Sequence, residues 1–451
     1  MAFQSSLKSL KPSQPLTTEY AVKSPNRSSW VLGVAIALSS VAGAYAQTPA
    51  VPLSVAGVKP EEITISQALA LAEEFSPRLT FARSQVEAAR AGITTARAYP
   101  NPELDAGWTQ FPARVGVGGA LRGSGQTLGI AQLIDLPSVR APRSRIAESS
   151  LGVALALSAD VRLQLRASVK QAYVEGLRRR AEAELLADNE RLIREIRNRV
   201  EIRVNVGEAA RFELVRADAE LASAANLTNS ARLRAAQALA NLRAVIGAPL
   251  GTDLDVSGEM EGSKEIPSLD VLRQQAIERQ PILRANQQDV ARAQARLETE
   301  RALRTPAPVV RAGAVRDPQA NELRIGVSIP LPLWNRREGP IGEAVAGLQQ
   351  ANAALDLRRI ELFAAVDAAV SRYRVATQQI AAFEGGLLRQ AEAALRVAEA
   401  AFRFGERGFI DVLDAQRVLR SVRLDFLAAR FELQAALVEI ERLRVADLPP
   451  D

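Results

Sequence analysis

The chain has 451 residues, with 57 Lys and Arg against 51 Asp and Glu, for a formal net charge of +6. It contains no Cys, no His and only two Met. These absences exclude disulfides, Cys or His metal ligands, Cys or His nucleophile–base pairs and a lipid-bearing Cys. Arg residues are scattered among Glu and Asp and aromatic residues are few, so we expect no nucleic-acid partner.

The first 46 residues are typical of a secretory signal peptide with an unusually long basic start. An apolar run from Trp30 to Val41 precedes the small-x-small sequence AYA at residues 44–46. The run is shorter than the roughly 20 residues that a membrane helix needs, although an N-terminal anchor is the alternative interpretation. We therefore predict a signal peptide over 1–46 and a short N-terminal segment of the exported protein over 47–62.

The rest of the chain is predicted to consist of two copies of one unit. An offset of 204 residues aligns Pro77 with Pro281, and an offset of 198 residues aligns Gly207 with Gly405. Near-constant offsets over about 180 residues indicate an internal duplication. The predicted boundaries are a first repeat over 63–250, a linker over 251–265, a second repeat over 266–446 and a C-terminal tail over 447–451.

The first copy shows helix, strand, strand, long helix, turn and helix signals. The glycine-rich ARVGVGGALRGSG between the strands predicts an external loop, and Ser66 is the expected N-cap of the first helix. The predicted elements are a helix over 66–98, strands over 103–112 and 126–136, a helix over 140–205, the interruption NVGEA, and a helix that ends at the IGAP of 246–249.

The second copy follows the same order, with a helix over 268–302, strands over 308–316 and 322–331, a helix over 341–403, the interruption FGERG and a helix over 408–446. At 1.5 Å per residue, the 140–205 helix is on the order of 100 Å long. The two shorter helices of each copy match that length if they stack end to end against the long one. Heptad-like spacing of apolar residues suits close coiled-coil packing. The predicted fold class is mainly α, with duplicated long-helix hairpins and a strand pair at one end of each.

The four strands have the length of outer-membrane barrel strands, which is about ten residues. ELRIGVSIPL alternates, with Leu323, Ile325 and Val327 on one face and Arg324 and Ser328 on the other. Four strands cannot close a membrane barrel, and lipid does not tolerate open strand edges. Several chains are therefore expected to pool their strands in one barrel; a soluble hairpin that caps a helical bundle is the alternative.

The mature chain, from ITISQALALAEEFSPRL (63–79) to AALVEIERL (435–443), resembles the TolC-like outer-membrane channel proteins of Gram-negative tripartite export systems. AYPNPELDAGW (98–108) and SIPLPLWNRREGPIGEA (328–344) are most similar to the cobalt–zinc–cadmium efflux branch. Many members of that branch carry a lipidated Cys at the mature start, where this chain has Gln47.

The resemblance implies a homotrimer whose four strands per chain complete a 12-stranded transmembrane β-barrel in outer-membrane lipid. It also implies an α-barrel that extends far into the periplasm, where residues 47–62 also lie. The implied partners are a periplasmic adaptor (membrane fusion) protein and an inner-membrane pump of the resistance–nodulation–division (RND) type. The channel itself would be passive, with no enzyme activity, cofactor or metal site of its own.

The two helix interruptions lie at the end of each repeat opposite the strands. Gly207 and Gly405 suit a helix C-terminus that turns back sharply, because a left-handed backbone is easiest for glycine. These segments are at least tight turns, and the resemblance implies that they also dock the adaptor. The residues expected at the docking tips are Val206, Gly207, Glu208, Phe404, Gly405 and Glu406.

A periplasmic aperture is expected beside these turns. Asp411 and Asp414 are one helical turn apart and so share a face, although a plain solvated helix face is the alternative. By the resemblance, a trimer would place them in two rings of three carboxylates, which attract cations. Arg407 matches a family position that ties neighbouring hairpins together when the channel is closed, with Glu213 as its expected acidic partner.

The resemblance implies heavy-metal cations as the exported substrate. The sequence leaves open export of drugs or other small molecules by the same fold, and a different class, a secreted helical scaffold or adhesion protein. No Ser, carboxylate or phosphate-loop constellation points to an enzyme. Without His or Cys, the mature wall offers none of the soft ligands that discriminate transition metals, so we expect the pump to choose the substrate.

Overall fold

The computed structural model describes residues 62–111, 123–251, 253–260, 262, 264–317 and 320–446, and all of them belong to one compact unit, Ser54–Asp451. The predicted signal peptide, all but the last residue of the 47–62 segment, the 447–451 tail and most of the glycine-rich loop lie outside the described residues.

The helices are α1 (Ile65–Phe75), α2 (Pro77–Arg97), α3 (Pro137–Asn205), α4 (Arg211–Ile246), α5 (Leu269–Arg279), α6 (Pro281–Ala302), α7 (Glu338–Ala382), α8 (Leu388–Arg403) and α9 (Phe409–Arg444). The strands are β1 (Glu62–Ile63), β2 (Glu103–Phe111), β3 (Gly123–Leu133), β4 (Asp255–Val256), β5 (Val309–Arg316) and β6 (Asn321–Ser328). The predicted mainly helical class is confirmed.

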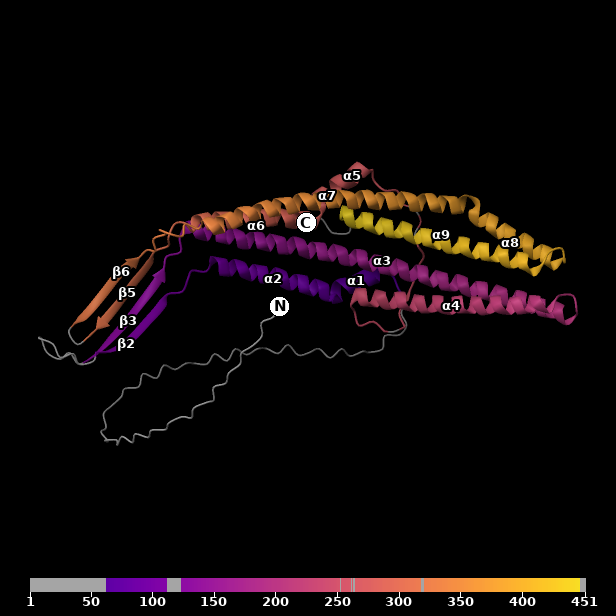
Figure 1. The fold of residues 1–451 in the computed structure, drawn as a ribbon, viewed down its shortest axis with the longest axis horizontal. Coiled ribbons are helices and arrows are strands. Elements are labelled where there is room, and N and C mark those ends of the chain that lie inside the picture. The colour runs from indigo at the N-terminus through magenta and orange to yellow at the C-terminus, as the bar shows by residue number, and fades with distance from the viewer. Residues whose placement is uncertain are drawn as a thin grey trace, which may run out of the picture. The chain divides into compact units, whose positions relative to one another are not determined.

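The shorter helices follow one another along the long ones (Figure 1). Helices α1, α2 and α4 pack against α3, whereas α5, α6 and α9 pack against α7. Helix α3 also packs against α6 and α9, which joins the two halves of the described chain. The end-to-end stacking expected from helix lengths is therefore present in both halves.

Two predicted helices are each divided by a proline. The helix expected over 66–98 consists of α1 and α2, and the helix expected over 268–302 consists of α5 and α6. Pro77 and Pro281 occupy the first position of α2 and α6, after Ser76 and Gln280 in extended conformation. Proline lacks the N–H of the helical ladder, and its ring disfavours helical backbone at the preceding residue, so each helix must restart there.

Two further helix predictions need correction. Thr64, not Ser66, is the N-cap of α1: its side chain accepts from the Gln67 amide, while its own amide donates to Gln67 Oε1 at 2.8 Å. This reciprocal capping box satisfies two amides of the first turn. The helix expected over 341–403 is interrupted by a π-helical turn, η1 (Phe383–Leu387), in which Gly386 has a φ of 154°. Only glycine adopts such a backbone at low cost.

The strands of both halves form one antiparallel sheet in the order β2–β3–β5–β6. Each half contributes one antiparallel strand pair, and the central contact of β3 with β5 joins the two pairs into a single sheet. Residues directly opposite one another lie on the same face. One face therefore carries an apolar set, most of it exposed: Leu104, Ala106, Trp108, Leu128, Ile130, Val310, Ala312, Ala314, Leu323, Ile325 and Val327.

The opposite face of the sheet is polar and rich in glycine. Gly107, Gly129, Gly313 and Gly326 lie on it, together with charged side chains that include the ion pair between Arg324 and Glu322, 2.7 Å apart. The sheet is thus two-sided, with an exposed apolar face and a face of small and polar residues.

A second sheet has two strands, with β1 parallel to β4. Strand β4 lies within the segment expected to be a linker. The buried Tyr173 of α3 lies behind it, with its hydroxyl 3.0 Å from the carbonyl of Ile63 and 2.5 Å from that of Ser257. This contact fixes the start of the first repeat to the segment that follows α4.

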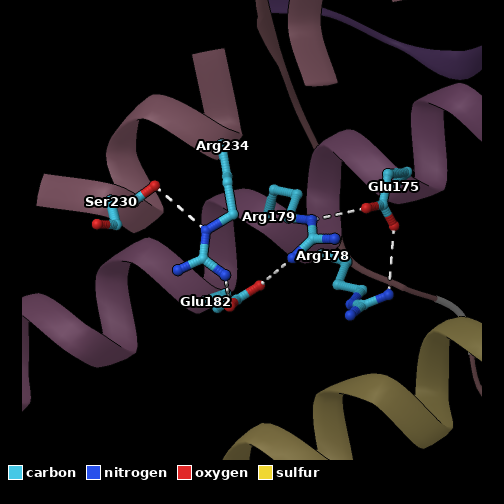
Figure 2. Close-up of polar contacts among 6 residues, drawn as sticks. All are labelled: Glu175, Arg178, Arg179, Glu182, Ser230 and Arg234. Carbon is cyan, nitrogen blue, oxygen red and sulfur yellow. Dashed lines mark hydrogen bonds and ion pairs between the residues drawn. The ribbon is translucent and has the colours of Figure 1, made fainter. Parts of the chain in front are cut away.

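An ion-pair ladder reinforces the contact of α3 with α4 (Figure 2). Arg179 donates to Glu175 at 2.6 Å and to Glu182 at 2.9 Å, and Arg234 of α4 lies 3.6 Å from Glu182. The Glu182 side chain is only 14% exposed, so its charge is screened less than that of a surface pair. The ladder ties the two helices at mid-length.

The sheet allows a matched test of its close backbone packing. A Cβ at Gly313 would lie 2.9 Å from the Leu128 carbonyl oxygen, whereas a Cβ at Gly326 would meet nothing within 4 Å. Gly313→Ala should therefore lose about 1–3 kcal/mol of stability through overpacking. We expect a lower melting temperature for Gly313→Ala than for Gly326→Ala; equal melting temperatures would contradict the strand contact.

Candidate functional site at the helical turns

The two interhelical turns have the same backbone design. After α3, Gly207 has a φ of 81° and Glu208 N donates to Arg203 O at 2.8 Å. After α8, Gly405 has a φ of 77° and Glu406 N donates to Ala401 O at 2.9 Å. Both are Schellman motifs, in which a left-handed glycine satisfies the last carbonyls of the helix. The conformation that the sequence predicted for both glycines is confirmed.

The turns present apolar side chains to solvent. Val206 is 64% exposed and Phe404 is 77% exposed. Directly beneath the second turn, Phe402 and Phe409 are buried, with ring centroids 6.3 Å apart. The buried rings hold the start of α9 against the end of α8, so the exposed Phe404 sits on a rigid support. Each of the two turns thus carries one exposed apolar side chain at its tip.

Asp411 and Asp414 lie in the first turns of α9, and each has an arginine neighbour. Arg407 lies 3.9 Å from Asp411, and Arg417 lies 3.6 Å from Asp414. The carboxylate side chains are 45% and 63% exposed, so these pairs contribute little to stability. Both carboxylates therefore remain open to solvent and to ions.

The pairing of Arg407 with Glu213 is not formed within the described chain. Arg407, in the turn before α9, is directed to Asp411 in the first turn of α9, while Glu213 lies half-buried in the first turn of α4. Arg407 and Asp411 are only four residues apart in the chain, so Arg407 reaches Asp411 without crossing to α4.

A stronger contact between the hairpins was not predicted from the sequence. Arg417 of α9 donates to Glu220 of α4 through two hydrogen bonds of 2.5 and 3.3 Å. The Glu220 side chain is only 11% exposed, and its hydrogen bond raises the pKa of the Arg417 guanidinium. Bidentate pairs of this kind fix geometry as well as charge. Arg417 thus ties the second hairpin to the first close to Asp414.

Next to this ion pair, Gln416 of α9 donates to the side-chain oxygen of Asn189 on α3, and both residues are at least 95% buried. Within the described residues, Asn189 Nδ2 and Gln416 Oε1 have no hydrogen-bond partner. The available sequence signal was the position of Gln416 in the otherwise apolar stripe of α9, which includes Phe409, Val412 and Leu413. A buried polar pair of this kind sets the register of packed helices.

The described part of the chain contains no group of three or more Asp, Glu, His or Cys side chains placed to hold a metal ion. Among the described helices, none combines the length and apolar character needed to cross a membrane. The chemistry at the turns is therefore that of dispersed carboxylates and arginines beside exposed apolar groups.

Long helical hairpins in both halves, one shared sheet with an exposed apolar face and two glycine turns define a class of mainly helical proteins built from long hairpins and a single sheet. A model of the family described as outer membrane efflux protein matches residues 68–248 and 272–444. The chain therefore belongs to the outer membrane efflux protein family.

Two relatives are similar over most of the chain. The cobalt-zinc-cadmium resistance protein CzcC of Cupriavidus metallidurans is 28% identical over 428 residues, which cover 91% of this chain and 98% of the relative. The nickel-cobalt-cadmium resistance protein NccC of Alcaligenes xylosoxydans xylosoxydans is 26% identical over 355 residues, which cover 77% of this chain and 75% of that protein.

Solved structures show the same fold. A membrane protein from Pseudomonas aeruginosa superposes with a TM-score of 0.75 at 20% identity, covering 84% of this chain and 92% of that one. The outer membrane protein VceC from Vibrio cholerae gives a TM-score of 0.70 at 20% identity, covering 84% and 95%. Together these findings confirm the resemblance found in the sequence, an outer-membrane location and a role as an efflux channel.

The Asn189–Gln416 pair can be tested with a double-mutant cycle. Asn189→Leu alone leaves the Gln416 amide buried without its partner and should cost about 1–3 kcal/mol of stability. Asn189→Leu with Gln416→Leu removes both polar groups and should recover most of that loss. Thermal unfolding of the purified protein measures each step; strictly additive losses would show that the two amides do not interact.

Proposed function

We propose that three copies of this chain form the outer-membrane exit duct of a tripartite efflux system for heavy-metal cations. The observation that carries the proposal is the sheet β2–β3–β5–β6, with its exposed apolar face and a free edge on β2 and on β6 within the described chain. A free edge is costly in lipid, because each unpaired backbone group lacks water. Twelve strands from three chains remove every edge, which the four strands of one chain cannot do.

The two faces of the sheet suit opposite sides of such a barrel. The apolar face would contact lipid, and the polar face would line the duct. On the polar face, glycines at 107, 129, 313 and 326 leave little side-chain volume, so they favour an open lumen.

Prolines mark where pairing between copies would stop. Pro100 and Pro102 precede β2, and Pro330 and Pro332 follow β6. The sheet register puts the start of β2 and the end of β6 at the same end, next to the helices. Proline cannot donate a ladder hydrogen bond, so the edge-to-edge pairing would end where the chain turns into helices.

The relatives support metal cations as the cargo, since their names specify resistance to cobalt, zinc, cadmium and nickel. The chain has no Cys and no His, so its wall is a poor discriminator among these ions. It would act as a passive duct without enzyme activity, and an inner-membrane pump of the RND type would select the ions and supply the energy.

The helical turns are the proposed contact with a periplasmic adaptor protein. The exposed apolar groups Val206 and Phe404 and the acidic groups Glu208 and Glu406 flank glycines 207 and 405 at the two tips. Three chains supply six such tips around one opening, and Asp411, Asp414, Glu213 and Arg407 would line its narrow mouth.

The proposal predicts that the purified protein is a detergent-dependent trimer that conducts ions. Native mass measurement in detergent should give three chains per particle, and planar bilayers should show channels of uniform conductance. A stable monomer in plain buffer, with no conductance, would support the secreted scaffold instead.

The acidic residues of the mouth should set its ion preference. Asp411→Asn with Asp414→Asn removes two carboxylates from each of three chains, so the preference for cations should fall without loss of the trimer. Arg407→Ala should instead raise resting conductance, because it would remove the tie that we propose between neighbouring hairpins of the assembled, closed channel. The measurements are reversal potential and single-channel conductance.

Glu87→Gln on α2 is the matched control, since Glu87 is 67% exposed and far along the chain from the turns. If the double Asn variant keeps wild-type selectivity, Asp411 and Asp414 are an ordinary solvated face.

A further inference from the structure

The apolar face of the sheet ends in one row of hydrogen-bond donors. The register places Trp108, Gln126, Arg316 and Asn321 side by side across all four strands. The next row toward the helices is apolar, with Ala106, Leu128, Ala314 and Leu323. On this face, an apolar row of side chains is therefore followed directly by a row of hydrogen-bond donors.

Arg316 has the properties of a residue at a lipid boundary. It is exposed, and no ion pair is formed by it within the described residues. Glu322, on the neighbouring strand, lies on the opposite face and is engaged by Arg324 at 2.7 Å. An arginine on a lipid-facing strand costs about 2–4 kcal/mol at mid-membrane but little near the interface. Trp108 beside it is 71% exposed, and indoles are enriched at that level.

The row lines a hollow of about 930 Å³ together with Leu128 and Leu323. Glu322 also lines this hollow, and its carboxylate is engaged by Arg324. Guanidinium, indole and two amide groups offer several N–H donors, while the leucines offer an apolar floor. A guanidinium matches the oxygens of a phosphate in a forked arrangement. The hollow thus combines a phosphate-binding edge with a surface for acyl chains.

We propose that this row binds a phosphate group of lipopolysaccharide in the outer leaflet. The inference rests on the proposed function. One end of the strands lies far from the helices (Figure 1), and the proposed function places that end at the cell exterior. The outer leaflet there consists of phosphorylated glycolipid, whereas phospholipid phosphates lie in the inner leaflet, at the helical end of the sheet. The position of the row therefore selects the glycolipid as its occupant.

The test compares Arg316→Gln with Arg311→Gln, an arginine on the same strand but on the opposite face of the sheet. The trimer is incubated with lipopolysaccharide, phosphatase-treated lipopolysaccharide or phosphatidylglycerol, and bound lipid is measured by native mass spectrometry. Arg316→Gln should weaken binding of intact lipopolysaccharide about tenfold, the loss of one charged hydrogen-bonded contact. Arg311→Gln should bind like the wild type, and Arg316→Lys should fall between them.

Equal lipopolysaccharide binding by the wild type and Arg316→Gln would overturn the inference. Binding of phosphatase-treated lipopolysaccharide that is as tight as binding of intact lipopolysaccharide would also overturn it. The same holds if phosphatidylglycerol binds as tightly as intact lipopolysaccharide and this binding depends on Arg316. Membrane insertion and trimer mass are measured in the same samples. Failure of the wild type to insert would refute the proposed function, whereas normal insertion with binding independent of Arg316 refutes only the lipid site.

Discussion

The free edges of the β2–β3–β5–β6 sheet are the constraint on which the rest of this molecule depends. Each outer strand has backbone donors and acceptors without partners inside the described chain, next to a face of exposed apolar side chains. Water can satisfy the edges but not the apolar face, and lipid can cover the face but not the edges. The proposed closure with further copies of the same chain would meet both requirements.

The helices must then hold the tips at a defined distance from that sheet. Helix α3 has 69 residues, about 100 Å at 1.5 Å per residue, and it contacts helices of both halves. Apolar packing tolerates sliding of such helices, whereas polar contacts resist it. The Asn189–Gln416 bond and the Arg417–Glu220 pair both join α9 to the first hairpin, so they fix the height of one turn against the other.

Most of the fold could be predicted from patterns among residues that are close together in the sequence. Apolar spacing predicts the long helices, and Gly207 and Gly405 predict the turns, because each depends only on nearby residues. Pro77 and Pro281 also act locally, and the helix breaks there follow from proline chemistry that the periodic pattern hides.

The remaining features depend on residues distant in sequence. Strands β1 and β4 have two residues each and lie far apart in the chain, so no sequence pattern predicts them. The Asn189–Gln416 contact spans 227 residues, and Arg417 reaches Glu220 across 197 residues. Such pairs are determined by how the hairpins pack. For the same reason, the sequence indicated acidic groups near the turn but not that Arg407 lies beside Asp411. The pairing of Arg407 with Glu213 stays a prediction.

The central claim is that β6 of one copy pairs with β2 of the next. Because the chain has no native Cys, Asp105→Cys on β2 can be combined with single cysteines along residues 322–328 of β6 without background. Oxidation in isolated outer membranes, read on non-reducing gels, should give covalent dimers and trimers at alternate positions of β6 only. Monomers at every position, with the protein otherwise folded, would contradict the shared barrel.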